Sequence, residues 1–66
     1  MPIVTIKLSK PELSKEDKES LIADITTLLS TKYSKPKERI VVMIEDIEPY
    51  DVGFGGKSVA KIRSKG

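Results

Sequence analysis

The 66-residue chain contains no cysteine and no histidine, and these two absences remove most of the side chains that usually carry chemistry. Without cysteine, no disulfide can cross-link the chain and no thiolate can act as nucleophile or ligand. Without histidine, the chain lacks the commonest metal ligand and the side chain that most readily exchanges protons near neutral pH. An enzyme with this sequence must therefore take its base from an amine, a carboxylate or a tyrosine.

The scarcity of aromatic residues, of net charge and of long apolar runs disfavours several other classes of function. Tryptophan is absent, and Tyr33 and Tyr50 are too few and too separated to form a stacking platform for bases. The 12 basic and 10 acidic residues are interspersed and leave a net charge of only +2, so we expect neither nucleic acid nor a membrane as partner. No apolar run is long enough for a signal or membrane segment, and we expect one cytoplasmic domain over residues 1–66.

We expect neither a cofactor nor a metal ion. Gly56-Lys57-Ser58 resembles the end of a phosphate-binding loop, but Asp51 stands where that motif requires its first glycine. The acidic stretch 45–48 lacks the ligand spacing of a site for a hard cation.

The feature that points to chemistry is Pro2, which directly follows Met1. If Met1 is removed, Pro2 begins the chain with a secondary amine, and its ring fixes the direction of the nitrogen lone pair. An ordinary α-amino group has a pKa of about 7.7–8.0, and an apolar pocket or neighbouring cations lower that pKa. Such an amine can act as general base and then as general acid. Pro2 is therefore the candidate catalytic residue.

Hydrophobic periodicity predicts a strand, a helix and a second strand. Residues 3–8 alternate in polarity, as a strand with one wetter face does. A helix is predicted over residues 15–33, with Ser14 as its N-cap and an end before Pro36. Its apolar stripe consists of Leu21, Ile22, Ile25, Leu28 and Leu29.

The second strand, residues 40–44, is apolar at every position and is therefore expected to be buried on both faces. A strand–helix–strand connection gives parallel strands, and a single helix covers only one face of their sheet. A chain of this size also buries only about 60% of its unfolded surface. We therefore expect an α+β fold, in which a βαβ monomer is completed by another subunit in an obligate oligomer.

This layout resembles the 4-oxalocrotonate tautomerase family over essentially the whole chain. The resemblance rests on Pro2-Ile3 opening a strand, the helix, Pro36, the apolar strand and the turn Gly53-Phe54-Gly55-Gly56. It implies an isomerase whose amino-terminal proline moves a proton between carbon and oxygen of a 2-hydroxydienoate or related enol acid. It also implies a dimer with a four-stranded sheet and two helices, a homohexamer built as a trimer of dimers, and active sites at subunit boundaries.

The sequence departs from the family at three positions that assist the proline in well-studied members. Leu13 and Val41 occupy the positions of two arginines from neighbouring chains, and Val52 occupies the position of an aromatic residue. All three residues are aliphatic. If they bind substrate, we expect the site to favour smaller or more apolar enol acids and to bind dicarboxylates weakly.

A cation that binds the substrate carboxylate must then come from elsewhere in the chain. Arg39 is the first candidate, because on a strand it would share a face with Val41, two residues further on. Lys37 and Lys10 are the alternatives. The competing hypothesis is a non-catalytic oligomeric scaffold or binding protein that retains the fold without the chemistry, which the aliphatic replacements also allow.

Overall fold

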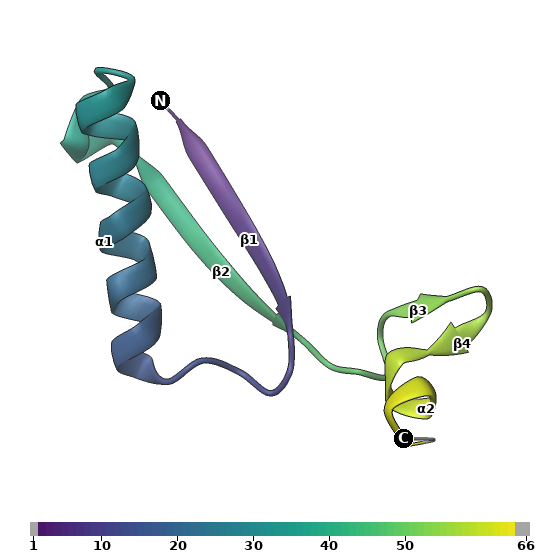
Figure 1. The fold of residues 1–66 in the computed structure, drawn as a ribbon. Helices are drawn as coiled ribbons and strands as arrows, with labels where there is room; N and C mark the ends of the chain where they lie inside the picture. The colour runs from purple at the N-terminus through teal and green to yellow at the C-terminus, as the bar shows by residue number, and fades with distance from the viewer. Residues whose placement is uncertain (1, 65–66) are drawn as a thin grey trace.

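The computed structural model describes residues 2–64 as a strand–helix–strand unit followed by a smaller C-terminal arm (Figure 1). In chain order the elements are β1 (Ile3–Ser9), α1 (Lys15–Lys32), the short 3₁₀ helix η1 (Lys37–Arg39), β2 (Val41–Ile47), β3 (Gly53–Phe54), β4 (Lys57–Ser58) and α2 (Val59–Ser64). β1 and β2 are parallel neighbours, which confirms the predicted βαβ monomer.

Local hydrogen bonds define both ends of α1. The Ser14 hydroxyl accepts a 3.0 Å hydrogen bond from the Asp17 N–H, as predicted for its N-cap. At the other end Ser34 has a positive φ of 56°, and the Lys35 N–H returns to the Leu29 carbonyl at 3.1 Å. This reversal sends the chain back toward the sheet. No helix in the described part of the chain is long and apolar enough to cross a membrane.

β2 is longer than its apolar run. It begins at Val41, one residue after the predicted start, and continues through Glu45 and Asp46 to Ile47 instead of stopping at residue 44. These last residues stay in the ladder because β1 pairs with them in register, from Ile3 with Val41 to Ser9 with Ile47. The predicted strand, residues 40–44, was therefore too short at its carboxyl end.

The sheet turns one face toward α1 and leaves the other open. The face toward α1 is half-buried, and it carries Val4, Ile6 and Leu8 of β1 opposite Val42, Ile44 and Asp46 of β2. From the helix, Leu21, Ile25 and Leu29 are half-buried, while Ile22 and Leu28 of the same stripe are exposed. The stripe is wider than a two-stranded sheet can cover.

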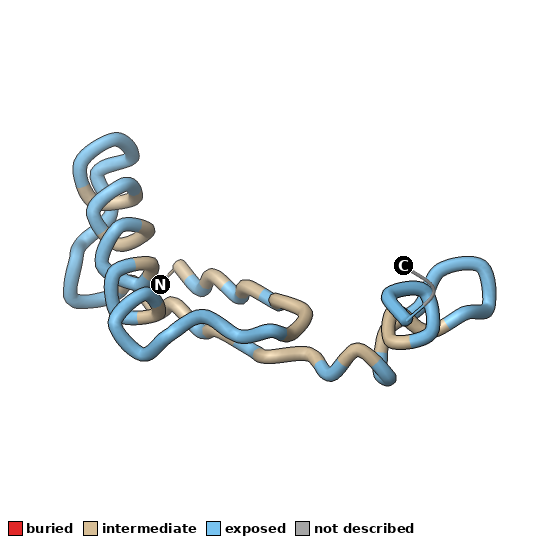
Figure 2. Tube along the Cα trace, turned by 60° about the horizontal axis from the view of Figure 1, so that its bottom comes forward, coloured by how far each residue is buried: buried red, intermediate tan, exposed pale blue. Residues whose placement is uncertain are grey.

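No residue in the range 2–64 is fully buried (Figure 2). On the open face, Ile3 is 58% and Met43 is 48% exposed. The accessible surface is 5196 Å², whereas a folded monomer of this mass has about 4,200 Å². The radius of gyration is 15.4 Å, against about 11 Å for a compact chain of this length. The isolated chain thus leaves uncovered much of the apolar surface that would form a core.

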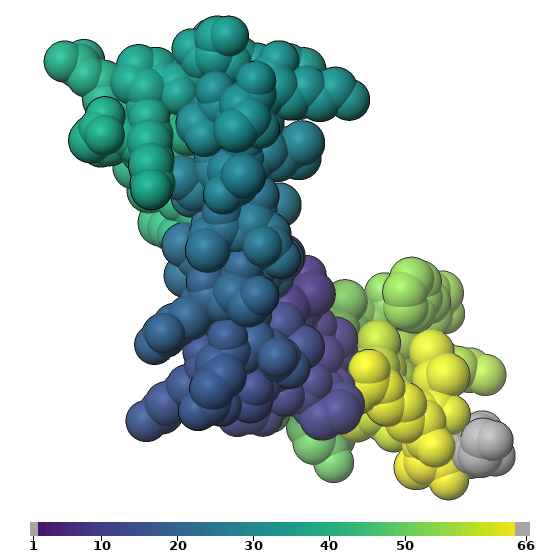
Figure 3. Space-filling view, turned by 60° about the vertical axis from the view of Figure 1, so that its left-hand side comes forward, coloured from purple at the N-terminus to yellow at the C-terminus, as the bar shows by residue number. Residues whose placement is uncertain are grey.

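The C-terminal arm, residues 48–64, projects from the end of the sheet (Figure 3). Gly55 and Gly56 have positive φ values of 59° and 85° and form the predicted turn between β3 and β4. α2 was not predicted from its weak pattern; the Ser58 hydroxyl starts it by accepting from the Lys61 N–H at 3.1 Å. Arg63 donates back to the Lys10 carbonyl and so ties the arm to the end of β1.

Candidate functional site

Pro2 is held beside the start of β2 by its own backbone. Its carbonyl accepts a 2.9 Å hydrogen bond from the Val41 N–H, and the parallel ladder of β1 and β2 begins with the next residue, Ile3. Pro2 is half-buried. Its place therefore depends on main-chain bonds of the sheet and not on a flexible side chain.

A half-open cavity of about 390 Å³ lies at this end of the molecule, and Pro2 lines it together with Lys35, Pro36 and Arg39. Three stretches of chain contribute to it: the amino-terminal end, the loop after α1, and η1. A proline whose nitrogen would be a free amine after removal of Met1 thus shares one cavity with two cationic side chains. Met1 itself lies outside the described residues, so its removal remains a prediction.

Main-chain hydrogen bonds also hold the backbone of the two cationic residues, both of which are exposed. Lys35 follows the left-handed Ser34 and is anchored by its N–H bond to Leu29. Arg39 closes η1 by donating its N–H to the Pro36 carbonyl at 3.0 Å. Neither side chain belongs to an ion pair within residues 2–64.

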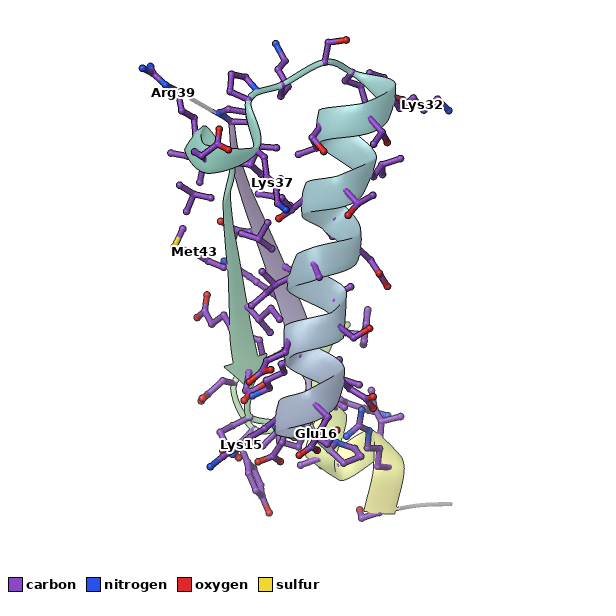
Figure 4. The ribbon with its side chains drawn as sticks, turned by 90° about the vertical axis from the view of Figure 1, so that its left-hand side faces the viewer. Lys15, Glu16, Lys32, Lys37, Arg39 and Met43 are labelled. Carbon is purple, nitrogen blue, oxygen red and sulfur yellow. The ribbon has the colours of Figure 1, made fainter. Side chains whose placement is uncertain are left out.

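Figure 4 shows how the basic side chains around this end diverge. Arg39 projects from η1 beside the start of β1, Lys37 lies on the side of η1 that faces α1, and Lys32 points away from the far side of the helix. Lys32 lies over the Tyr33 ring, with its Nζ 5.8 Å from the ring centroid. Of the residues labelled there, Arg39 is the cation that lines the cavity with Pro2.

The structure changes the argument for Arg39. The sequence prediction placed it on a strand, on the same face as Val41, and this was wrong because Arg39 belongs to η1. Pro36 caps this turn in an extended conformation (φ −63°, ψ 123°), and the turn brings Arg39 to the cavity. Its role in binding remains a proposal.

Lys10 and Lys37, the alternative cations, do not line the cavity with Pro2. Lys10 lies at the opposite end of β1, about 26 Å along the strand from Pro2 at 3.3 Å per residue. There it forms an ion pair with Glu48, with Nζ and Oε1 2.5 Å apart. The hydrogen bond from Lys10 to the Glu48 carboxylate raises the pKa of Lys10 above its ordinary value.

The three aliphatic positions are spread over the chain. Val41 adjoins Pro2, whereas Leu13 lies in the loop before α1 and Val52 lies in the C-terminal arm. Val52 lines a second, more open cavity of about 340 Å³, formed by Tyr50, Asp51, Val52, Gly53, Gly56, Lys57 and Ser58. A single chain therefore brings only Val41 of the three beside Pro2.

Lys35 is the cavity residue that sequence reasoning missed. A usable signal was present, because Lys35 stands between the end of the predicted helix and Pro36, where the chain must reverse. Among residues 2–64 there is no cluster of three acidic, histidine or cysteine side chains that could hold a metal ion.

Comparison with known proteins places the chain in a family. The family model described as "Tautomerase enzyme" matches residues 2–62. The chain is 68% identical to the Campylobacter jejuni protein named "Probable tautomerase Cj0270", covering 98% of this chain and 96% of that protein. Membership of the tautomerase family is therefore established, and the predicted resemblance is confirmed.

Solved structures agree with this assignment. DmpI from Helicobacter pylori has a TM-score of 0.83 and 33% identity, covering 98% of this chain and 100% of that chain. A heterohexameric 4-oxalocrotonate tautomerase from Chloroflexus aurantiacus has a TM-score of 0.80 at 22% identity, covering 96% and 100%, and this likeness concerns the fold alone. The predicted α+β fold is therefore that of the 4-oxalocrotonate tautomerases.

Proposed function

We propose that the protein is a tautomerase that interconverts the enol and keto forms of 2-hydroxydienoates or related enol acids, with Pro2 as the proton carrier. The observation that carries this proposal is the cavity that Pro2 shares with Lys35 and Arg39. A base and carboxylate-binding cations are the two components that isomerisation of an enol acid requires.

The chemistry needs a free Pro2 nitrogen, because an amide nitrogen has no lone pair to accept a proton. After removal of Met1, the neutral secondary amine takes the proton of the substrate 2-hydroxyl as the C=O double bond forms. The shifted electron pair of the C=C bond then takes a proton from the resulting ammonium at carbon, and the amine is regenerated. The positive charges of Lys35 and Arg39, which line the same cavity, favour the neutral form of the Pro2 amine over its ammonium form.

The working form that we propose is a homo-oligomer, a hexamer arranged as a trimer of dimers, in which two βαβ units join their sheets into four strands. Its support in this chain is the uncovered apolar surface, since the sheet leaves one face open and no residue of the range 2–64 is fully buried. A wider sheet would also cover the exposed flanks of α1, Ile22 and Leu28.

The test of Pro2 compares chains that differ only at the terminus. Fractions with and without Met1 are separated, identified by mass spectrometry, and assayed for ketonisation of phenylenolpyruvate against a buffer blank. We expect activity only in the fraction that lacks Met1, and loss of that activity on acetylation of the terminal nitrogen. Equal rates in the two fractions would exclude Pro2 as the base.

The second candidate function is a non-catalytic oligomeric binding protein, favoured by the aliphatic Leu13, Val41 and Val52. Titration of the Pro2 nitrogen by NMR separates the two. An enzyme requires a pKa below that of a free prolyl peptide, whereas a scaffold places no such demand on the terminus.

A further inference from the structure

We infer that Lys35 and Arg39 form a carboxylate clamp on the same chain as Pro2, and that this clamp selects enol acids with a single carboxylate and an apolar substituent. The inference rests on the proposed function and names the substrate class of that site. It differs from what the family resemblance implies, in which the substrate-binding arginines come from neighbouring chains.

The first argument is the arrangement of charge. Lys35 and Arg39 line the cavity with Pro2, and neither is engaged with a carboxylate anywhere in residues 2–64. Glu38, between them in sequence, is exposed and does not line the cavity. Two unneutralised cations facing one small cavity attract an anion, and a guanidinium can hold a carboxylate with two parallel hydrogen bonds.

The second argument is the apolar character of the other residues at the site. The remaining cavity walls are Pro2 and Pro36, and Val41 adjoins Pro2 at the start of β2. Apart from its two cations, the cavity is therefore lined by proline rings. A second carboxylate on the substrate would be placed against aliphatic surface, where its desolvation is not compensated.

The third argument is rigidity. Separate main-chain hydrogen bonds hold Pro2 to Val41, Lys35 to Leu29 and Arg39 to Pro36. We therefore expect the backbone at Pro2 to keep its position when either cationic side chain is replaced. Substitutions at positions 35 and 39 test binding without moving Pro2.

The experiment compares Arg39→Ala and Lys35→Ala with wild type, using Lys37→Ala as the charge-matched control. Lys37 is in the same turn and carries the same charge, but it does not line the cavity. The substrates are phenylenolpyruvate and the enol of its uncharged methyl ester. We expect each clamp variant to lose about tenfold more in kcat/KM for the acid than for the ester, with the extra loss mostly in KM. Equal losses on acid and ester, or equal losses in Lys37→Ala, would overturn the clamp.

A binding measurement keeps this result separate from the role of Pro2. Wild type should bind 3-phenylpropionate more tightly than 3-phenylpropanamide, and Arg39→Ala should abolish the preference. If the preference survives in both Arg39→Ala and Lys35→Ala, the clamp is wrong even where Pro2 is the base. If the clamp variants lose the preference while chains without Met1 show no catalysis, the clamp stands and the proposed function fails.

A subunit-mixing experiment tests whether the Pro2 and the Arg39 of one site come from the same chain or from two different chains. Chains carrying Pro2→Ala are denatured and refolded together with chains carrying Arg39→Ala, and mixed oligomers are verified by native mass spectrometry. With base and clamp on the same chain, no site in the mixture contains both, and activity stays at the average of the two parents. Activity above that average would show that Arg39 serves the Pro2 of a neighbour and would overturn the inference.

Discussion

At the scale of single residues, the ion pair of Lys18 and Asp46 joins the first turn of α1 to β2. Nζ and Oδ2 are 2.6 Å apart, and the side chains are only 30% and 25% exposed. The other carboxylate oxygen, Oδ1, is buried and has no hydrogen-bond partner within the described residues. Lys18 is therefore the main compensation for a charge placed between helix and sheet.

We predict that Lys18→Met lowers the free energy of unfolding by about 1–3 kcal/mol, because it leaves the Asp46 carboxylate without its partner in a partly screened site. Lys18→Met combined with Asp46→Asn should recover part of that loss. Urea unfolding at a fixed chain concentration measures both. The exposed Lys15→Met serves as control and should change stability by less than about 0.5 kcal/mol. Equal losses at positions 15 and 18 would show that the pair contributes nothing specific.

A second residue-scale prediction concerns pH. Because Glu48 raises the pKa of Lys10 in the folded protein, the pair's contribution is fully present below the ordinary lysine pKa of 10.5 and is lost as pH rises through the higher folded value. The stability difference between wild type and Glu48→Gln should therefore be constant from pH 7 to 9 and shrink above pH 10.5. Thermal unfolding across this range checks the sign, and a difference that grows at high pH contradicts it.

At the scale of elements, the hairpin of β3 and β4 depends on a close backbone approach at Gly53. A Cβ at this position would lie 2.5 Å from the Lys57 carbonyl oxygen and 3.1 Å from its carbon, both main-chain atoms. The hairpin cannot accept a side chain there without opening.

We expect Gly53→Ala to cost about 1–3 kcal/mol, as an overpacked site does, and to loosen the arm. Gly55→Asn is the matched control: a Cβ at this position meets nothing within 4 Å, and asparagine tolerates its left-handed conformation. Hydrogen exchange at residues 53–58 should accelerate in Gly53→Ala and stay near wild type in Gly55→Asn. Unchanged exchange in Gly53→Ala would contradict the close approach.

The elements also show which parts of the fold the sequence could specify. α1 was predictable because its signals are local: Ser14 caps its start by accepting a hydrogen bond from the Asp17 N–H, and Pro36 follows its end. The extension of β2 was not, because it includes Asp46, whose partner Lys18 lies 28 positions away in the sequence. No periodicity can be detected in three polar residues, so η1 was missed.

The same distinction, between local signals and contacts of residues distant in sequence, applies to the candidate site. Pro2 was proposed from the chemistry of a terminal amine together with the family resemblance, and Arg39 was chosen for a strand geometry that does not exist. Lys35 reaches the cavity only because the chain reverses at Ser34 and because β1 and β2 pair. Such a meeting of distant segments is a property of the tertiary structure.

At the scale of the whole molecule, the open face of the sheet and the arm carry the apolar surface that the chain cannot cover. Ile3 and Met43 lie on the open face, while Tyr50 and Phe54 in the arm are 81% and 70% exposed. An exposed apolar surface of this extent supports the interface with another chain that we propose.

We predict that Met43→Glu dissociates the oligomer, because it places a charge in the interface proposed for the open face. Light scattering should show a fall in mass at micromolar concentration, accompanied by partial unfolding. Glu19→Lys, on the exposed side of α1, is the control and should keep the wild-type mass. An unchanged mass in Met43→Glu would place the interface elsewhere.

The absence of any fully buried residue in the range 2–64 has a kinetic consequence. If the core closes only when chains meet, the last folding step is a collision, and its rate depends on how many chains are present. The βαβ unit, whose strands are joined through one helix, can form within a single chain as a transient species. Refolding after dilution from denaturant should then slow in proportion as the chain is diluted, and newly made protein should become protected from proteolysis only after its partners accumulate.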